Sequence, residues 1–254
     1  MSVRSAVAGE LGKTSMIYLS YGLPKSASTF SFYLAKAVAA AAGHDQTRIR
    51  TSLPEYLRRE YQDLQPGLLD DLVHCVPELT LLVVKTHSPL TSEIESHLDA
   101  GTVLASASFR DPRDVAVALF DAGISERRKA NGREAFTKIL CLEDTLDPLR
   151  TNLAHLSSWL EREDVLRIPF DLLVERPETA AARIADQVGL EIDSRSIGER
   201  LFRERAQIPE FNIGGKGRYR QAMTAAEQAT FTAEFHGEIE MIERLTAQAS
   251  PPAP

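Results

Sequence analysis

The fold is decided by residues 16–41, which read MIYLSYGLPKSASTFSFYLAKAVAAA. The first six residues form a short apolar run that is typical of a buried strand. From Phe30 onward, apolar side chains recur at intervals of three and four, which predicts a helix that ends at Gly43. The unit is therefore strand, loop and helix, and we expect Ser28 or Thr29 to cap the helix.

The same alternation continues along the chain. Further apolar runs at 80–84, 102–109 and 165–170 predict three more strands, and helical periodicity separates them. Strands that alternate with helices predict an α/β fold with a central, mostly parallel sheet flanked by helices. We expect one domain over residues 1–254, with loose ends at 1–15 and 249–254.

Composition excludes several classes of function. The formal charge of −7, from 29 basic and 36 acidic residues, argues against a nucleic-acid surface but allows a small anionic ligand. Cys75 and Cys141 are too few for a disulfide framework, and no HxxxH or HExxH spacing predicts a metal site. With no apolar leader and no run of about 18 apolar residues, we expect a cytoplasmic protein without a membrane contact.

Three loops follow directly on predicted strands, at 22–29, 85–90 and 110–114. The carboxyl ends of parallel strands meet at one edge of a sheet, and ligands bind there in open α/β folds. The sequence therefore predicts a binding site that combines these three loops.

The first loop departs from the nucleoside-triphosphate template GxxxxGK[ST]. Counted from Gly22, the second glycine and the lysine are replaced by Ala27 and Ser28, and Thr29 follows; a lysine occurs earlier, at Lys25. The backbone N–H groups at a helix N-terminus still attract an anion. We expect one phosphate on these amides, with the lysine reaching an adjoining charged group; an ordinary strand-to-helix turn is the alternative.

Four segments carry a family resemblance. Residues 24–30, PKSASTF, resemble the PKSGTTW-type loop of the PAPS-dependent sulfotransferases, where PAPS is 3′-phosphoadenosine-5′-phosphosulfate. Residues 85–90, KTHSPL, are similar to the family's KTHxP segment, and residues 109–118, FRDPRDVAVA, to its RNPxDVxVS segment. Residues 214–220, GGKGRYR, resemble more weakly the GxxGRW version of its late glycine-rich loop. The resemblance implies the P-loop-NTPase-like fold of the cytosolic sulfotransferases.

The resemblance also assigns roles to residues. It implies that His87 is the general base for the acceptor proton and that Lys85 and Lys25 lie near the sulfuryl group and its bridging oxygen. Arg110 matches the arginine that binds the 3′-phosphate. The donor-binding residues implied in this way are Lys25, Ser26, Ala27, Ser28, Thr29, Phe30, Arg110, Ala118, Phe170, Gly214, Gly215, Lys216, Gly217 and Arg218.

Three positions depart from the family pattern. Ala118 stands where the family has a serine on the 3′-phosphate, and residues 212–213, Asn-Ile, stand where it has Arg-Lys. Phe170 falls near the adenine, where many members have a tyrosine. The cations that could replace the missing contacts are Lys216, Arg218 and Arg220.

Several of these residues also have a purely structural interpretation. His87 could bond a backbone carbonyl at a strand end, and Arg110 and Arg113 could pair with neighbouring aspartates, which we favour for Arg113. The basic run at 127–129 is typical of a solvated helix face, although it could line a lid in the charged segment after the third motif. Trp159 is expected to pack in the core.

Sulfuryl transfer, like phosphoryl transfer, is an in-line displacement that depends on positioning and electrostatics. We expect a PAPS-dependent sulfotransferase that acts, without a metal, on a hydroxyl or amine of a small-molecule acceptor. The alternatives are a kinase-like phosphotransferase, disfavoured by the missing Walker residues, and a non-catalytic nucleotide-binding protein on a degenerate scaffold, suggested by Ala118. The sequence does not name the acceptor, and it leaves the oligomeric state open, a homodimer included.

Overall fold

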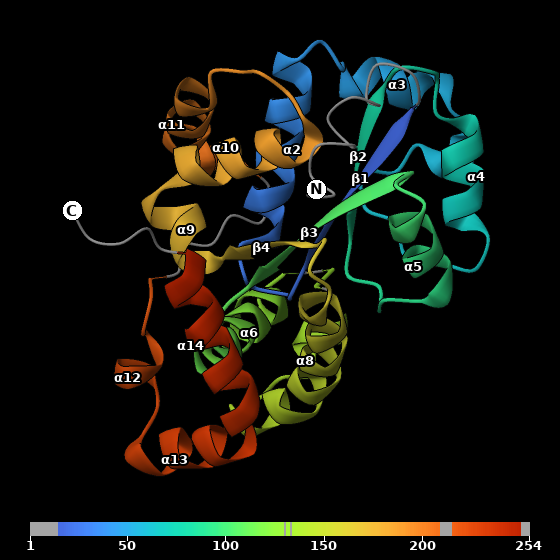
Figure 1. Ribbon diagram of the computed structural model, residues 1–254. Helices are drawn as coiled ribbons and strands as arrows, with labels where there is room; N and C mark the ends of the chain where they lie inside the picture. The colour runs from blue at the N-terminus through green and yellow to red at the C-terminus, as the bar shows by residue number, and fades with distance from the viewer. Residues whose placement is uncertain (1–14, 130, 133, 209–214, 250–254) are drawn as a thin grey trace.

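A four-stranded sheet with every neighbouring pair parallel lies at the centre of the molecule (Figure 1). The computed structural model describes residues 15–129, 131–132, 134–208 and 215–249. The strand order is β2-β1-β3-β4, which confirms the α/β fold with a parallel sheet. The strands are β1 (Met16–Gly22), β2 (Leu81–Thr86), β3 (Val103–Phe109) and β4 (Leu166–Pro169).

The sheet is buried on both faces, which explains why its strands read as continuous apolar runs. Successive side chains of a strand point to opposite faces. In β1, Ile17, Leu19 and Tyr21 therefore enter the larger core, whereas Met16 and Tyr18 enter a second core on the other face.

Helices cover the two faces unequally. Figure 1 shows α2, α10 and α11 on one side of the sheet and α6, α8 and α14 on the other. The second core is closed by α2 (Ser28–Ala41), α10 (Pro177–Val188) and α11 (Ser194–Arg203). The larger core is closed by α4 (Leu68–Cys75), α5 (Ser92–Asp99), α6 (Pro112–Arg127), α8 (Leu146–Glu161), α13 (Ala225–Glu234) and α14 (His236–Ala249).

Short helices connect these layers. They are α3 (Gln46–Ser52), η1 (Glu55–Leu57), α7 (Glu134–Thr137), η2 (Glu143–Thr145), α9 (Phe170–Glu175), η3 (Arg205–Gln207) and α12 (Tyr219–Ala222).

Two predicted boundaries next to the site are wrong. The N-cap of α2 is Ala27 rather than Ser28 or Thr29, because Ala27 adopts the left-handed conformation and turns the chain into the helix without a side-chain cap. Strand β2 continues through Lys85 and Thr86, beyond the predicted end at residue 84. It continues because Lys85 pairs with β1 on one side and with a short segment at 60–62 on the other.

Other boundaries differ in the second half of the chain. The predicted fourth strand stops at Pro169, and Phe170 opens α9. The capping box of Thr224 and Glu227 is confirmed, but the single final helix predicted after it is two helices, α13 and α14. They divide at Phe235, which leaves helical geometry while its ring stays buried against Phe231.

In the part of the chain that the structure describes, no helix has both the length and the apolarity to cross a membrane. The predicted loose ends at 1–15 and 249–254 lie outside the described residues, except for Ser15 and Ala249.

Candidate active site

The loop between β1 and α2 has an alternating backbone. Lys25 and Ala27 are left-handed, with φ of 67° and 64°, whereas Ser26 between them is not. The left-handed conformation costs a non-glycine residue about 1–2 kcal/mol, and such strain gathers at functional sites. Alternation of handedness is typical of backbone nests that bind anions, although the N–H of Ser26 in this loop donates to the carbonyl oxygen of Leu23 at 3.1 Å.

The first turn of α2 adds to this anion site. Ala27 has no side chain that could cap the helix, and the first turn contains no acidic residue. The N–H groups of a first turn have no partner within the helix, and they carry partial positive charge. Lys85 reaches the same turn from β2, because its Nζ donates to Oγ1 of Thr29 over 2.8 Å.

Gly22 allows β1, α2 and β3 to approach one another closely next to this loop. A Cβ at Gly22 would lie 2.3 Å from the Cβ of Ser28 and 2.4 Å from Oγ of Ser108. Ser26 is fully buried, and its Oγ lies 3.0 Å from both the carbonyl oxygen and Oγ of Ser108. Ser26 therefore ties the loop to β3, which is a different role from the ligand contact that the sequence suggested.

His87 lies directly after β2, and its Nδ1 hydrogen-bonds to the carbonyl oxygen of Gly22. A carbonyl can only accept, so Nδ1 carries the proton and Nε2 carries the lone pair. This tautomer is the one that accepts a proton at Nε2. The structural interpretation of His87 is thus confirmed, and it is compatible with the predicted role as a base.

Tyr61 is a neighbour of His87 that the sequence did not reveal. Its ring centroid lies 5.5 Å from that of His87 and 6.0 Å from Nζ of Lys85. The residue is 48% exposed, and burial of the remainder raises the pKa of the Tyr61 phenol. A half-exposed tyrosine therefore lies beside His87 and Lys85, two of the three predicted catalytic residues.

Arg110 connects the first loop to the late glycine-rich loop. It is 4% exposed, and it donates to the carbonyl oxygens of Lys25 at 3.3 Å and Gly215 at 2.7 Å. Its guanidinium carbon lies 4.0 Å from the centroid of the Phe170 ring. Burial lowers the pKa of Arg110, and the charge of Asp114 opposes that effect. Among the described residues, Nε of Arg110 has no hydrogen-bond partner.

Asp114 is a second residue that the sequence did not identify as part of the site. Its carboxylate is 2% exposed and accepts the backbone N–H groups of Gly217, at 2.7 Å, and Tyr219, at 3.0 Å. The same carboxylate lies 3.5 Å from the guanidinium of Arg110. Its spacing of four residues from Arg110 was the available signal, and this buried acid fixes the described part of the late loop.

A pocket of about 390 Å³ lies beside Arg110. It gathers four predicted donor-binding residues, Arg110, Phe170, Lys216 and Gly217, together with Arg220.

Two cations of the late loop, Lys216 and Arg218, form ion pairs with acidic residues. Lys216 is paired with Asp171, which raises the pKa of the Lys216 ammonium, and Arg218 is paired with Asp121 at 2.7 Å. The predicted contact at Gly214 and the departure at 212–213 lie outside the described residues.

The sequence matches no known protein family and no curated protein at a significant level. Solved structures do match. Mouse sulfotransferase SULT7A1 complexed with PAP has a TM-score of 0.60 and 15% identity, over 97% of this chain and 96% of that chain. Retinol dehydratase in complex with androsterone and the inactive cofactor PAP has a TM-score of 0.57 and 18% identity, over 88% and 80% of the two chains. Its complex with retinol and PAP has a TM-score of 0.58 and 19% identity, over 93% and 85%.

The chain has the sulfotransferase fold. The sulfotransferase fold that the sequence motifs implied is thereby confirmed.

Ala118 and Phe30, which were predicted to bind the donor, are buried apolar residues of this sulfotransferase fold. Ala118 lies on the buried face of α6 and contributes packing. Phe30 is buried in the second core, where its ring meets that of Phe202 edge-on at 6.3 Å. The structure therefore brings together Lys25, Thr29, Lys85, His87 and Arg110, but neither Ala118 nor Phe30 presents an open surface.

The structural roles expected for Arg113 and Trp159 are confirmed. Arg113 pairs with Asp111 at 2.6 Å. Trp159 is fully buried and stacks on Tyr21 with ring centroids 4.9 Å apart.

The run at 127–129 is exposed as predicted, but it is not a helix face, because α6 ends at Arg127 and residues 128–129 lie beyond the helix. Arg127 nevertheless donates to the carbonyl oxygen of Ile139, and Lys129 pairs with Glu126 at 2.6 Å.

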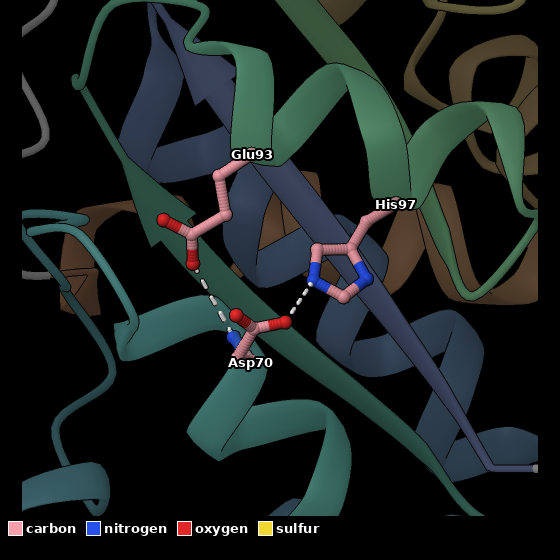
Figure 2. Close-up of side chains that lie close together, drawn as sticks. All are labelled: Asp70, Glu93 and His97. Carbon is pink, nitrogen blue, oxygen red and sulfur yellow. Dashed lines mark hydrogen bonds and ion pairs between the residues drawn. The ribbon is translucent and has the colours of Figure 1, made fainter.

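Asp70, Glu93 and His97 form a group of possible metal ligands within the described residues (Figure 2). Nε2 of His97 lies 2.9 Å from the carboxylate of Asp70. The carboxylate of Glu93 accepts the backbone N–H groups of Gly67 and Asp70, at 3.0 and 3.4 Å. These bonds join α5 to the start of α4, and that structural role accounts for the cluster.

Proposed function

We propose that the chain is a PAPS-dependent sulfotransferase that transfers a sulfuryl group to a hydroxyl or amine of a small-molecule acceptor. The observation that carries the proposal is the meeting of three features at one sheet edge. They are the strained anion loop, Nζ of Lys85 on Thr29, and His87 with Nδ1 at the carbonyl oxygen of Gly22. The sulfotransferase fold, seen in neighbours complexed with PAP, supports the same chemistry.

The residues fit an anionic nucleotide. Ala27 and the first turn of α2 offer backbone N–H groups to the 5′ end, whereas the N–H of Ser26 donates to the carbonyl oxygen of Leu23. Arg110 offers its buried Nε beside the pocket that it lines. A buried donor without a partner is costly, and we propose that an anionic oxygen satisfies it after the Arg110 side chain shifts on binding. PAPS has an anionic group at each end, the 5′-phosphosulfate and the 3′-phosphate. The loop would bind the first and Arg110 the second, which favours PAPS over a nucleotide with one phosphate group.

The chemistry assigns a separate task to each residue. PAPS supplies an activated sulfuryl group on a phosphate leaving group. Lys25 and Lys85 stabilise the negative charge that develops on the bridging oxygen, and they do so more strongly in the transition state than in the ground state. Nε2 of His87 takes the proton of the acceptor, a contribution of about 10²–10⁴-fold.

The 3′-phosphate is held without the hydroxyl that Ala118 lacks. Arg110 is the first contact in this proposal, and Lys216 and Arg220 are the best replacements because they line the same pocket. Arg218 is less suitable, because it pairs with Asp121 and is absent from that pocket lining. Lys216 must exchange its bond with Asp171 for one to the phosphate.

The acceptor class is supported by two neighbours. The retinol dehydratase structures contain androsterone and retinol, which are apolar molecules that carry a hydroxyl. Tyr61 presents an exposed aromatic face beside His87, where an apolar acceptor could pack. We therefore propose a hydroxyl-bearing small molecule as the acceptor, in a cytoplasmic setting and without a metal.

The test is transfer of label from radiolabelled PAPS to a panel of alcohols, phenols and amines. Lys25→Ala and His87→Ala should each reduce transfer by orders of magnitude and keep the circular dichroism spectrum. Lys129→Ala and His236→Ala are the matched controls, because each removes the same kind of side chain where it is exposed and lies beside an acid outside the site, Glu126 and Glu240 respectively. Full transfer by Lys25→Ala and His87→Ala would refute the assigned roles. Binding of PAPS without transfer to any acceptor would favour the non-catalytic alternative.

A further inference from the structure

Lys25 has an aromatic partner from a distant part of the chain. Its Nζ lies 4.5 Å from the centroid of the Phe136 ring. Phe136 belongs to α7, in the charged segment at 125–148 to which the sequence assigned no definite role. A cation over an aromatic face is attracted by the quadrupole of the ring. The segment therefore contacts the proposed site through the pair of Lys25 and Phe136.

The middle of this segment, at residues 136–139, lies against α6. A Cβ at Gly123 of α6 would lie 2.7 Å from the carbonyl oxygen of Ile139 and 3.0 Å from that of Phe136. Arg127, at the end of the same helix, donates to the carbonyl oxygen of Ile139. The close approach and the hydrogen bond place Phe136 relative to the helix that begins at the Arg110 motif.

The next part of the segment, at residues 139–144, is held in place as well. The carboxylate of Asp144 accepts the backbone N–H groups of Leu140 and Cys141, at 2.7 and 3.0 Å. Ile139 and Leu142 are buried in the larger core. The chain on the C-terminal side of Phe136 is therefore anchored to the body of the protein.

We propose that Phe136 is a positioning residue that holds the ammonium of Lys25 beside the anion loop before the donor binds. The proposal rests on the proposed function. A lysine side chain loses considerable rotamer freedom when it is fixed, and a ligand must otherwise supply that ordering when it binds. The ring of Phe136 orders the ammonium in advance.

An aromatic partner suits this task better than a carboxylate. A carboxylate beside Lys25 would neutralise its charge and would repel the anionic donor. The ring of Phe136 attracts the ammonium without cancelling its charge, so the N–H donors of Lys25 that face away from the ring can still bind an anion. The pair thus orders the cation without cancelling its charge.

The test uses isothermal calorimetry with two probes, adenosine 3′,5′-bisphosphate and adenosine 3′-monophosphate. Phe136→Leu keeps an apolar side chain but removes the quadrupole. It should weaken binding of the bisphosphate about 3- to 30-fold and leave the monophosphate unchanged, because the monophosphate lacks the 5′-phosphate. Phe136→Tyr should bind both probes as the wild type does.

Phe120→Leu is the matched control. Phe120 is half-buried on α6 and packs against the same core as Phe136, and no cation lies over its ring among the described residues. Its substitution should change neither affinity. If Phe136→Leu does not yield folded protein, Phe136→Met provides the same comparison with Phe136→Tyr.

A double-mutant cycle separates positioning from general support. In a Lys25→Met background, Phe136→Leu should have no further effect on bisphosphate affinity. An equal loss in that background, or an equal loss for the monophosphate, would overturn the inference. Wild-type affinity in Phe136→Leu, with Lys25→Met still weakened, would overturn the inference and leave the proposed function intact. Failure of the wild type to bind the bisphosphate would overturn both.

Discussion

Asp114→Asn should destabilise the protein far more than its small change in shape suggests. The carboxylate is buried and accepts two backbone N–H groups of the late loop beside the Arg110 guanidinium. An amide keeps one accepting oxygen, but it presents an NH₂ group to the second N–H and leaves Arg110 without its carboxylate. Loss of one partner from a buried pair costs about 3–5 kcal/mol. The 3.5 Å separation from Arg110 places the expected cost at the lower end, about 3 kcal/mol.

Urea unfolding followed by tryptophan fluorescence measures this cost, because the single tryptophan, Trp159, is fully buried. Asp147→Asn is the matched control. It removes the same charge from an ion pair with Arg150 in which the two side chains are 90% and 47% exposed, and an exposed pair contributes about 0–1 kcal/mol. Asp114→Asn should also weaken binding of adenosine 3′,5′-bisphosphate, since the late loop would lose its anchor. Equal unfolding free energies for the two variants would refute this reasoning.

Two further predictions concern Gly22, at the start of the first loop, and Asp144, in the charged segment at 125–148. Gly22→Ala brings its methyl group to 2.3 and 2.4 Å from two serine side chains, and the forced shift should cost about 1–3 kcal/mol in thermal unfolding. Gly237→Ala, where a Cβ meets nothing within 4 Å, should unfold no earlier than the wild type; equal melting temperatures for the two alanine variants would contradict the steric argument. Backbone N–H groups of Leu140 and Cys141 lower the pKa of Asp144 below its ordinary 3.8, so its stabilising contribution is complete above pH 3.8 and is lost as pH falls through the lowered pKa. Stability of the wild type should therefore fall more steeply below pH 3.8 than that of Asp144→Asn, and parallel acid-denaturation curves would show that the carboxylate contributes nothing.

The strands and their parallel arrangement were predictable from the sequence. Strands buried on both faces need continuous apolar runs, and such runs are visible without any knowledge of tertiary contacts. The end of β2 was missed, because Lys85 is polar and owes its place in the strand to backbone pairing with β1 and with residues 60–62. Phe235 was placed inside a helix, because its apolar spacing is helical even though its backbone is not.

The candidate site was predictable where its residues lie at or next to strand ends. Lys25, Lys85, His87 and Arg110 were identified because three loops follow predicted strands and because the segments that contain them resemble sulfotransferase motifs. Asp114 and Phe136 were not, since their partners, Gly217 and Lys25, are far away in the sequence.

Ala27 shows a different limit of sequence reasoning. Local propensity disfavours a left-handed alanine, so a helix cap by Ser28 or Thr29 was the better prediction. The tertiary structure imposes the strained conformation at Ala27, and local rules are expected to fail at functional sites of this kind.

A sulfotransferase donor site and a kinase site differ most directly in the nucleotide that they prefer. Isothermal calorimetry of the full chain with adenosine 3′,5′-bisphosphate, and separately with ATP and Mg²⁺, measures that preference. We expect the bisphosphate to bind more tightly than ATP–Mg²⁺, and we expect Lys25→Ala to weaken the bisphosphate. Tighter binding of ATP–Mg²⁺, or bisphosphate binding that does not depend on Lys25, would contradict a phosphosulfate site on the loop between β1 and α2.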